Sequence, residues 1–113
     1  MTFIVPDFVR DEIAGIARWY DSKPGRYGQT FLDEVEIGLK AIRENPRIHP
    51  PAEDGREGQE DREFLISRFK QRVVFTIEDD NVIVLSVIHA SCKPGRWFLH
   101  RIFPSANNYE FSP

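Results

Sequence analysis

The residues of this chain that could do chemistry are basic and aromatic side chains in its second half. They lie in two stretches: Arg62, Arg68, Lys70 and Arg72, and then His89, Lys93, Arg96, Trp97 and Arg101. Histidine can act as a base or an acid near neutral pH, and Arg and Lys stabilise negative charge. A folded sheet could bring both stretches into one basic patch, although a solvated strand face explains them equally well.

His89 also has a purely structural interpretation. It ends a strand that is apolar on both faces, and it shares the parity of Ile83, Leu85 and Val87. A histidine in that position is expected to hydrogen-bond to the backbone or to a side chain of the following turn. We therefore favour a structural role for His89 over a catalytic one.

Arg72 and Trp97 each have two interpretations as well. Arg72 lies on the mixed face of its strand beside Thr76 and Glu78, where a surface ion pair with Glu78 is as plausible as phosphate binding. The ring of Trp97 is more often buried against a sheet than stacked on a nucleic-acid base. The residue types alone therefore leave a binding site and an ordinary strand face as alternatives.

Length and composition indicate a single domain. The chain has 113 residues, of which 41% are hydrophobic, and this is enough apolar side chain to offset chain entropy. We expect one domain over residues 1–113, with a core at about residues 2–97 and a C-terminal tail at residues 98–113. No apolar run is long enough to cross a bilayer and no signal-peptide pattern begins the chain, so we expect a cytoplasmic protein.

Charge and cysteine content exclude several classes of site. Cys92 is the only cysteine, and together with His49, His89 and His100 it shows no zinc-ligand spacing, so we expect no metal and no cofactor. The net charge of −3 argues against a general nucleic-acid binder. The distribution is uneven, however: residues 1–60 hold eight Lys and Arg against twelve Asp and Glu, and residues 61–113 hold seven against six.

Residues 2–45 predict a short strand followed by a helical hairpin. The apolar run at residues 2–5 stops at Pro6, and two amphipathic segments follow on either side of a turn at residues 21–25. The first segment has apolar residues at helical spacing at Val9, Ile13, Ile16, Ala17 and Tyr20, and the second at Tyr27, Phe31, Val35, Gly38, Leu39 and Ile42. Asn45-Pro46 ends the second helix, because the residue before a proline is pushed out of the helical region.

Residues 46–88 predict a long loop and three antiparallel strands. The loop, residues 46–61, is rich in proline, glycine and acidic residues, and mobility explains it better than partner binding. The strand at residues 72–78 has an apolar face with Val73, Phe75 and Ile77, and a mixed face that we expect to reach solvent. Residues 82–88 are apolar on both parities except at Ser86, which is typical of a strand in the middle of a sheet.

The order of these elements and four short motifs together resemble a known family. The motifs are the helix ending FLDEVEIGLKAIRENP, Arg62 after a glycine-bearing loop, the hairpin RVVFTIEDDNVIVLSVIH, and the strand-end His89 followed by Lys93, Pro94 and Trp97. Over about residues 2–97 the chain resembles the RelE/ParE superfamily of bacterial type II toxins. The resemblance implies an α+β fold of order β-α-α-β-β-β, in which a helical hairpin packs on a small antiparallel sheet.

The resemblance implies two alternative activities. Members of the superfamily either cleave messenger RNA on the ribosome or inhibit DNA gyrase, and a cognate antitoxin neutralises both kinds. A metal-independent ribonuclease would draw on Arg68, Arg72, His89 and Lys93 for phosphate binding and proton transfer. Nucleases of the RelE branch commonly carry a tyrosine near the last strand, whereas the segment after His89 has none and Tyr109 lies far along the tail.

We therefore favour the ParE branch, whose members act on gyrase by protein contact. This interpretation implies growth inhibition, a role in plasmid stabilisation, and apolar grooves by the helices and sheet edge that receive the antitoxin. The expected target-binding residues are Arg62, Arg68, Arg72, Lys93, Arg96 and Trp97. A homodimer, a hetero-oligomer with the antitoxin, and a non-toxic binding module on the same fold stay open.

Overall fold

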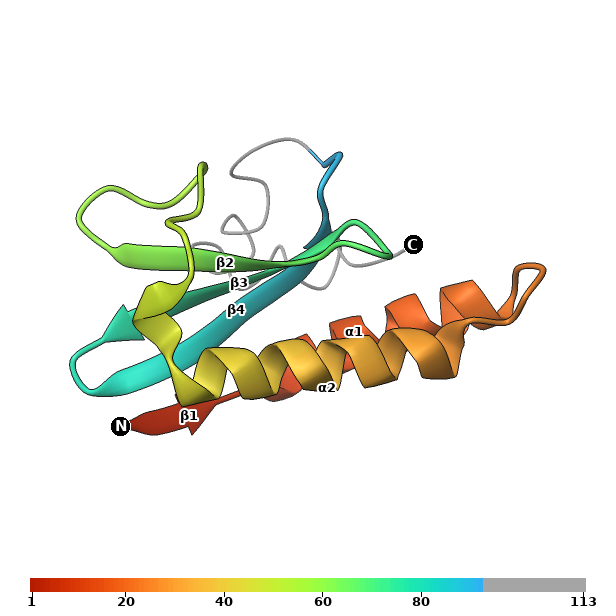
Figure 1. Ribbon diagram of the computed structural model, residues 1–113, viewed down its shortest axis with the longest axis horizontal. Coiled ribbons are helices and arrows are strands. Elements are labelled where there is room, and N and C mark those ends of the chain that lie inside the picture. Colours follow the sequence, from red (N-terminus) through yellow and green to blue (C-terminus); the bar gives the residue numbers. More distant parts are fainter. Residues whose placement is uncertain (93–113) are drawn as a thin grey trace.

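Two antiparallel helices pack on one face of a four-stranded sheet in the computed structural model (Figure 1), which describes residues 1–92. The elements are β1 (Thr2–Ile4), α1 (Asp7–Asp21), α2 (Gly28–Glu44), a short 3-10 helix η1 (Pro46–Ile48), β2 (Glu60–Ile66), β3 (Gln71–Glu78) and β4 (Asn81–His89). The predicted α+β fold and its β-α-α-β-β-β order are confirmed. Within the described residues, no helix is both long enough and apolar enough to cross a membrane.

The sheet has the order β1-β4-β3-β2 and is mixed rather than wholly antiparallel. β2, β3 and β4 pair antiparallel as predicted, whereas β1 pairs parallel with β4 through Thr2↔Asn81, Phe3↔Val82 and Ile4↔Ile83. Parallel neighbours require a long crossover, which is supplied here by the helical hairpin followed by β2 and β3. The central position predicted for residues 82–88 is confirmed, because β4 has a partner on each side.

A β-bulge in β4 changes which residues share a face. Val74 pairs with Ser86 and Phe75 pairs with Val84, so Leu85 has no partner in the ladder. The extra residue reverses the alternation of side chains between the two faces of the sheet. Val84 and Val87 therefore both lie on the face that packs against the helices. His89 was predicted on one face with Ile83 and Leu85, and this is wrong. Beyond the bulge His89 lies two residues after Val87 and shares the face of Val87 instead.

Each helix buries one stripe of side chains against the sheet. The buried residues of α1 are Val9, Ile13 and Ala17, and those of α2 are Gly28, Phe31, Val35, Gly38 and Ile42. At Gly38 a Cβ atom would lie 3.0 Å from the ring of Phe64, so glycine allows α2 to approach β2 closely. Tyr27 was predicted in this stripe but precedes the helix, and its side chain is 46% exposed.

The second face of the sheet is also buried, contrary to the expectation that it reaches solvent. Val74 and Thr76 are fully buried there, and Ala52 from the loop packs against Val74 and Leu85. The loop is tied to β2 by backbone hydrogen bonds from the Ala52 N–H to the Asp61 carbonyl and from the Glu63 N–H to the Pro50 carbonyl, both 3.0 Å long. The prediction of a mobile loop is wrong for this part, because its polar backbone groups extend the sheet edge.

Candidate functional site

The structure distributes the predicted site residues over separate places. Arg62 lies in β2, Arg72 is the second residue of β3, Arg68 lies in the β2–β3 turn and His89 ends β4. Arg62 and Arg68 are separated by the last four residues of β2, roughly 13 Å of extended chain, and by the start of the turn. Lys93, Arg96 and Trp97, like the tail at residues 98–113, lie outside the described residues.

Arg72 is held between two carboxylates in a buried ion-pair cluster. Its Nη1 and Nη2 donate to the Asp54 carboxylate at 2.8 and 2.9 Å, and Nη1 also donates to Glu63 Oε1 at 3.2 Å. The Arg72 side chain is only 10% exposed, and the hydrogen bond with Asp54 raises its pKa despite burial, which acts in the opposite direction. The predicted surface pair with Glu78 is wrong, because the loop brings Asp54 over the face where Arg72 points.

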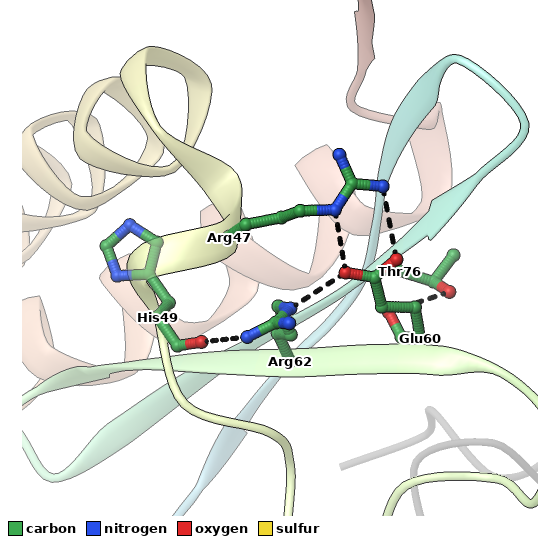
Figure 2. Close-up of polar contacts among 5 residues, drawn as sticks. All are labelled: Arg47, His49, Glu60, Arg62 and Thr76. Carbon is green, nitrogen blue, oxygen red and sulfur yellow. Dashed lines mark hydrogen bonds and ion pairs between the residues drawn. The ribbon is translucent and has the colours of Figure 1, made fainter.

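A second cluster surrounds the first residue of β2 (Figure 2). The Glu60 carboxylate accepts hydrogen bonds from Arg47 at 3.1 and 3.2 Å and from Arg62 at 3.1 Å. Arg62 Nη1 also donates to the His49 carbonyl at 2.6 Å, and Thr76 Oγ1 donates to the Glu60 carbonyl at 3.3 Å. The hydrogen bond from Arg47 is the main reason why the pKa of Glu60 is lowered.

This Glu60 cluster keeps a surplus of positive charge near the surface. Two guanidinium groups share one carboxylate, and the side chains of Arg47 and Arg62 are 53% and 21% exposed. The sequence prediction included Arg62 but missed Arg47, which reaches Glu60 because η1 turns the chain back toward β2. The Pro46 that ends α2 was the available signal, although it could not indicate the direction of the turn.

A third carboxylate, that of Asp61, is completely buried beside Arg56. It accepts hydrogen bonds from the Arg56 backbone N–H at 2.8 Å and from Nε and Nη2 of the same residue at 2.9 Å each. Burial alone would raise the pKa of Asp61, but the hydrogen bonds from Arg56 outweigh burial and lower it below the ordinary value of 3.8. Asp61 thus stabilises the loop in its ionised form.

The lowered pKa of Asp61 predicts a stability difference that depends on pH. Asp61→Asn should reduce the free energy of unfolding by about 1–3 kcal/mol near pH 7, because the buried guanidinium contacts lose their charged acceptor. A carboxylate with a lowered folded-state pKa stabilises fully above the unfolded pKa and loses this effect as pH falls through the folded value. Urea unfolding should therefore show the gap between the two proteins shrinking below about pH 4. A gap that stays constant down to pH 2.5 would contradict this assignment.

His89 makes the turn contact that its position predicted. Its Nδ1 lies 2.7 Å from Ser91 Oγ and accepts a hydrogen bond from the Ser91 N–H at 3.1 Å. Nδ1 thus contacts both the hydroxyl and the backbone N–H of Ser91. The expected hydrogen bond to a turn side chain is confirmed, and it fixes the orientation of the ring.

The described residues also form a surface groove. A groove of about 640 Å³ lies between β1 and α2, and it is lined by Phe3, Glu36, Leu39, Lys40, Arg43 and Glu44. Two of its lining residues, Phe3 and Leu39, are apolar, and it lies where β1 forms one edge of the sheet. Among residues 1–92, no group of three or more His, Cys, Asp or Glu side chains is placed to hold a metal ion.

Comparison with known proteins identifies the family. No curated protein matches the chain. The family model described as "ParE toxin of type II toxin-antitoxin system, parDE" matches residues 6–94, which include both helices and the three antiparallel strands. Type II systems pair a toxin with an antitoxin, so membership implies an antitoxin partner. The chain belongs to the ParE toxin family of type II toxin–antitoxin systems.

Proposed function

We propose that this toxin inhibits DNA gyrase by protein contact and does not cleave RNA. The observation that supports this proposal is the state of Arg72, which a metal-independent ribonuclease would need as a phosphate ligand. Asp54 and Glu63 already occupy its guanidinium, and its side chain is 10% exposed. A phosphate would have to displace two carboxylates from a buried cation, which is costly.

In this proposal the target-binding surface includes the exposed part of the Glu60 cluster. Arg62 contributes there together with Arg47. Lys93, Arg96 and Trp97 stay proposed target-binding residues of the segment after β4, which lies outside the described residues. Arg72 supports the surface indirectly, because its ion pairs hold the loop that carries Asp54 against the sheet. The groove between β1 and α2 receives an apolar segment of the antitoxin, with Phe3 and Leu39 as its floor.

A supercoiling assay tests the proposal. Purified full-length toxin should inhibit gyrase-catalysed supercoiling, and added antitoxin should restore it. Arg47→Ala/Arg62→Ala should weaken inhibition on the order of tenfold, which corresponds to two partly exposed contacts. Arg10→Ala is the matched control, since Arg10 is an exposed arginine of α1 whose Nε bonds to the Val5 carbonyl.

The assay separates the proposal from its alternatives. Full supercoiling activity at saturating toxin would contradict gyrase inhibition. If primer extension then showed new cuts in transcripts after induction, the chain would act as a ribosome-dependent endonuclease instead. Normal growth on overexpression without the antitoxin would indicate a non-toxic binding module.

A further inference from the structure

The end of the helical hairpin gathers basic and aromatic side chains, and of these the sequence analysis assigned only Arg68 to target binding. We define the hairpin tip as residues 18–28, which join α1 to α2, together with the β2–β3 turn at residues 67–70. The two segments lie against each other, since the Tyr20 hydroxyl donates to the Phe69 carbonyl at 3.4 Å and their rings are 4.8 Å apart. Both turns lie toward the same end of the molecule (Figure 1).

The hairpin tip is a strongly positive region of an acidic protein. It carries five basic residues, all exposed, and one acidic residue, Asp21. The basic residues are Arg18, Lys23, Arg26, Arg68 and Lys70. The whole chain has fifteen Lys and Arg and eighteen Asp and Glu, so the remainder holds ten basic and seventeen acidic residues. The Asp21 carboxylate is partly engaged, because it accepts a hydrogen bond from the Gly28 N–H at 2.9 Å.

Two aromatic rings lie at the surface among these cations. The side chains of Trp19 and Tyr27 are 56% and 46% exposed. Lys23 Nζ lies 5.1 Å from the centre of the Trp19 ring, and the Arg68 guanidinium lies 5.7 Å from the centre of the Tyr27 ring. Each exposed ring therefore has a cation beside it.

In each of the two turns, one basic residue has a backbone conformation that is energetically unfavourable. Arg26 and Lys70 have φ angles of 49° and 53°, a left-handed conformation that favours Gly or Asn over long side chains. Gly25 has a φ of 95°, and a Cβ atom there would overlap the Tyr27 ring, so this ring rests on the turn. Glycine or asparagine would adopt this conformation at a lower energetic cost than Arg26 and Lys70. The presence of charged residues at these two positions therefore indicates a functional role for their charge.

We propose that the hairpin tip binds single-stranded nucleic acid. Exposed rings beside cations form a stacking platform on which bases lie while Lys and Arg contact the phosphates. An acidic peptide would satisfy the cations but leave both exposed rings unused, so the rings favour a nucleic acid. The net charge of the whole chain opposes binding elsewhere on the surface, which restricts a polyanion to the tip. The proposal goes beyond gyrase inhibition and does not depend on it.

Fluorescence anisotropy of a labelled twelve-nucleotide DNA strand, titrated with the full-length chain, tests this site. Binding should weaken as salt rises, with a slope near −0.7 for each phosphate contacted. R26N/K70N should lower affinity on the order of tenfold and reduce the slope by about 1.4. Asparagine tolerates the left-handed conformation, so this variant keeps the turns. Trp19→Ala should weaken binding about 5- to 150-fold through the loss of stacking.

Two controls make the outcome decisive. K40Q/R43Q removes the same charge from the far end of α2 and should change affinity less than twofold. R18Q/K23Q removes two exposed cations at ordinary backbone angles and should repeat the loss seen with R26N/K70N. Absence of salt-dependent binding, or an equal loss in K40Q/R43Q, would overturn the proposal. A further pair of results would also overturn it: a twelve-residue oligoglutamate competes as strongly as unlabelled DNA, and Trp19→Ala binds DNA with unchanged affinity. Together these results would indicate that the tip binds an acidic protein segment.

Discussion

Arg72→Ala is expected to lower the free energy of unfolding by about 3–5 kcal/mol. The substitution leaves the carboxylates of Asp54 and Glu63 buried without the cation that neutralises them, at side-chain exposures of 4% and 19%. Typical domains are stable by only 5–15 kcal/mol in total, so the variant should be partly unfolded under mild stress. Urea unfolding at pH 7, followed by circular dichroism, measures the change.

A triple variant that removes every charge of this cluster distinguishes the effect of unpaired buried charge from the effect of lost packing. Replacing Arg72 with Met, Asp54 with Asn and Glu63 with Gln in one protein should recover most of the loss, because no buried charge is then left unpaired. A loss below 1 kcal/mol in Arg72→Ala would contradict the buried-cluster assignment. The expected instability also affects activity assays: reduced toxicity of Arg72→Ala identifies a functional residue only if the folded fraction is measured in parallel.

Phe31→Ala should produce a loss of similar size, about 3–5 kcal/mol. Phe31 is fully buried and lies at the centre of an aromatic cluster, with ring centres 5.4 Å from both Tyr20 and Phe69. These contacts join α2 to α1 and to the β2–β3 turn. Truncation would therefore open a cavity where the helical hairpin meets the sheet, and thermal or urea unfolding measures the effect.

Two substitutions serve as controls for Phe31→Ala. Phe31→Leu keeps most of the apolar volume and should cost clearly less. Ile37→Ala removes an apolar side chain from the same helix, but Ile37 is 61% exposed, so the change should stay within about 0.5 kcal/mol. Equal losses in Phe31→Ala and Ile37→Ala would contradict the core role of Phe31, because alanine favours the helix at both positions and only burial distinguishes the two sites.

The Phe31 cluster also connects the core with the hairpin tip. Tyr20 and Phe69 contact Phe31 on one side and adjoin the exposed residues Trp19 and Arg68 on the other. A loosened cluster would let the two segments of the tip separate. The DNA affinity of Phe31→Leu therefore tests whether binding depends on their juxtaposition. Affinity should fall in step with loss of the cluster, while the gyrase inhibition that we propose for the Glu60 cluster should change less.

The sequence by itself determined the elements of this protein. Apolar spacing specified both helical stripes, from Val9 to Ala17 and from Phe31 to Ile42, and Asn45-Pro46 specified where α2 stops. The apolar run of β4 specified a central strand. These signals are local, because the periodicity of side chains along a helix or strand follows from backbone geometry alone.

The tertiary structure alone decided how these elements meet. The parallel pairing of β1, the bulge at Leu85 and the return of the loop over β3 each depend on residues far apart in the chain. The same holds for the partners of Arg72 and for the two segments of the hairpin tip. A charged side chain pairs with whichever group the fold places within a few ångströms of it, so sequence identifies the charges while only the packed structure determines their partners.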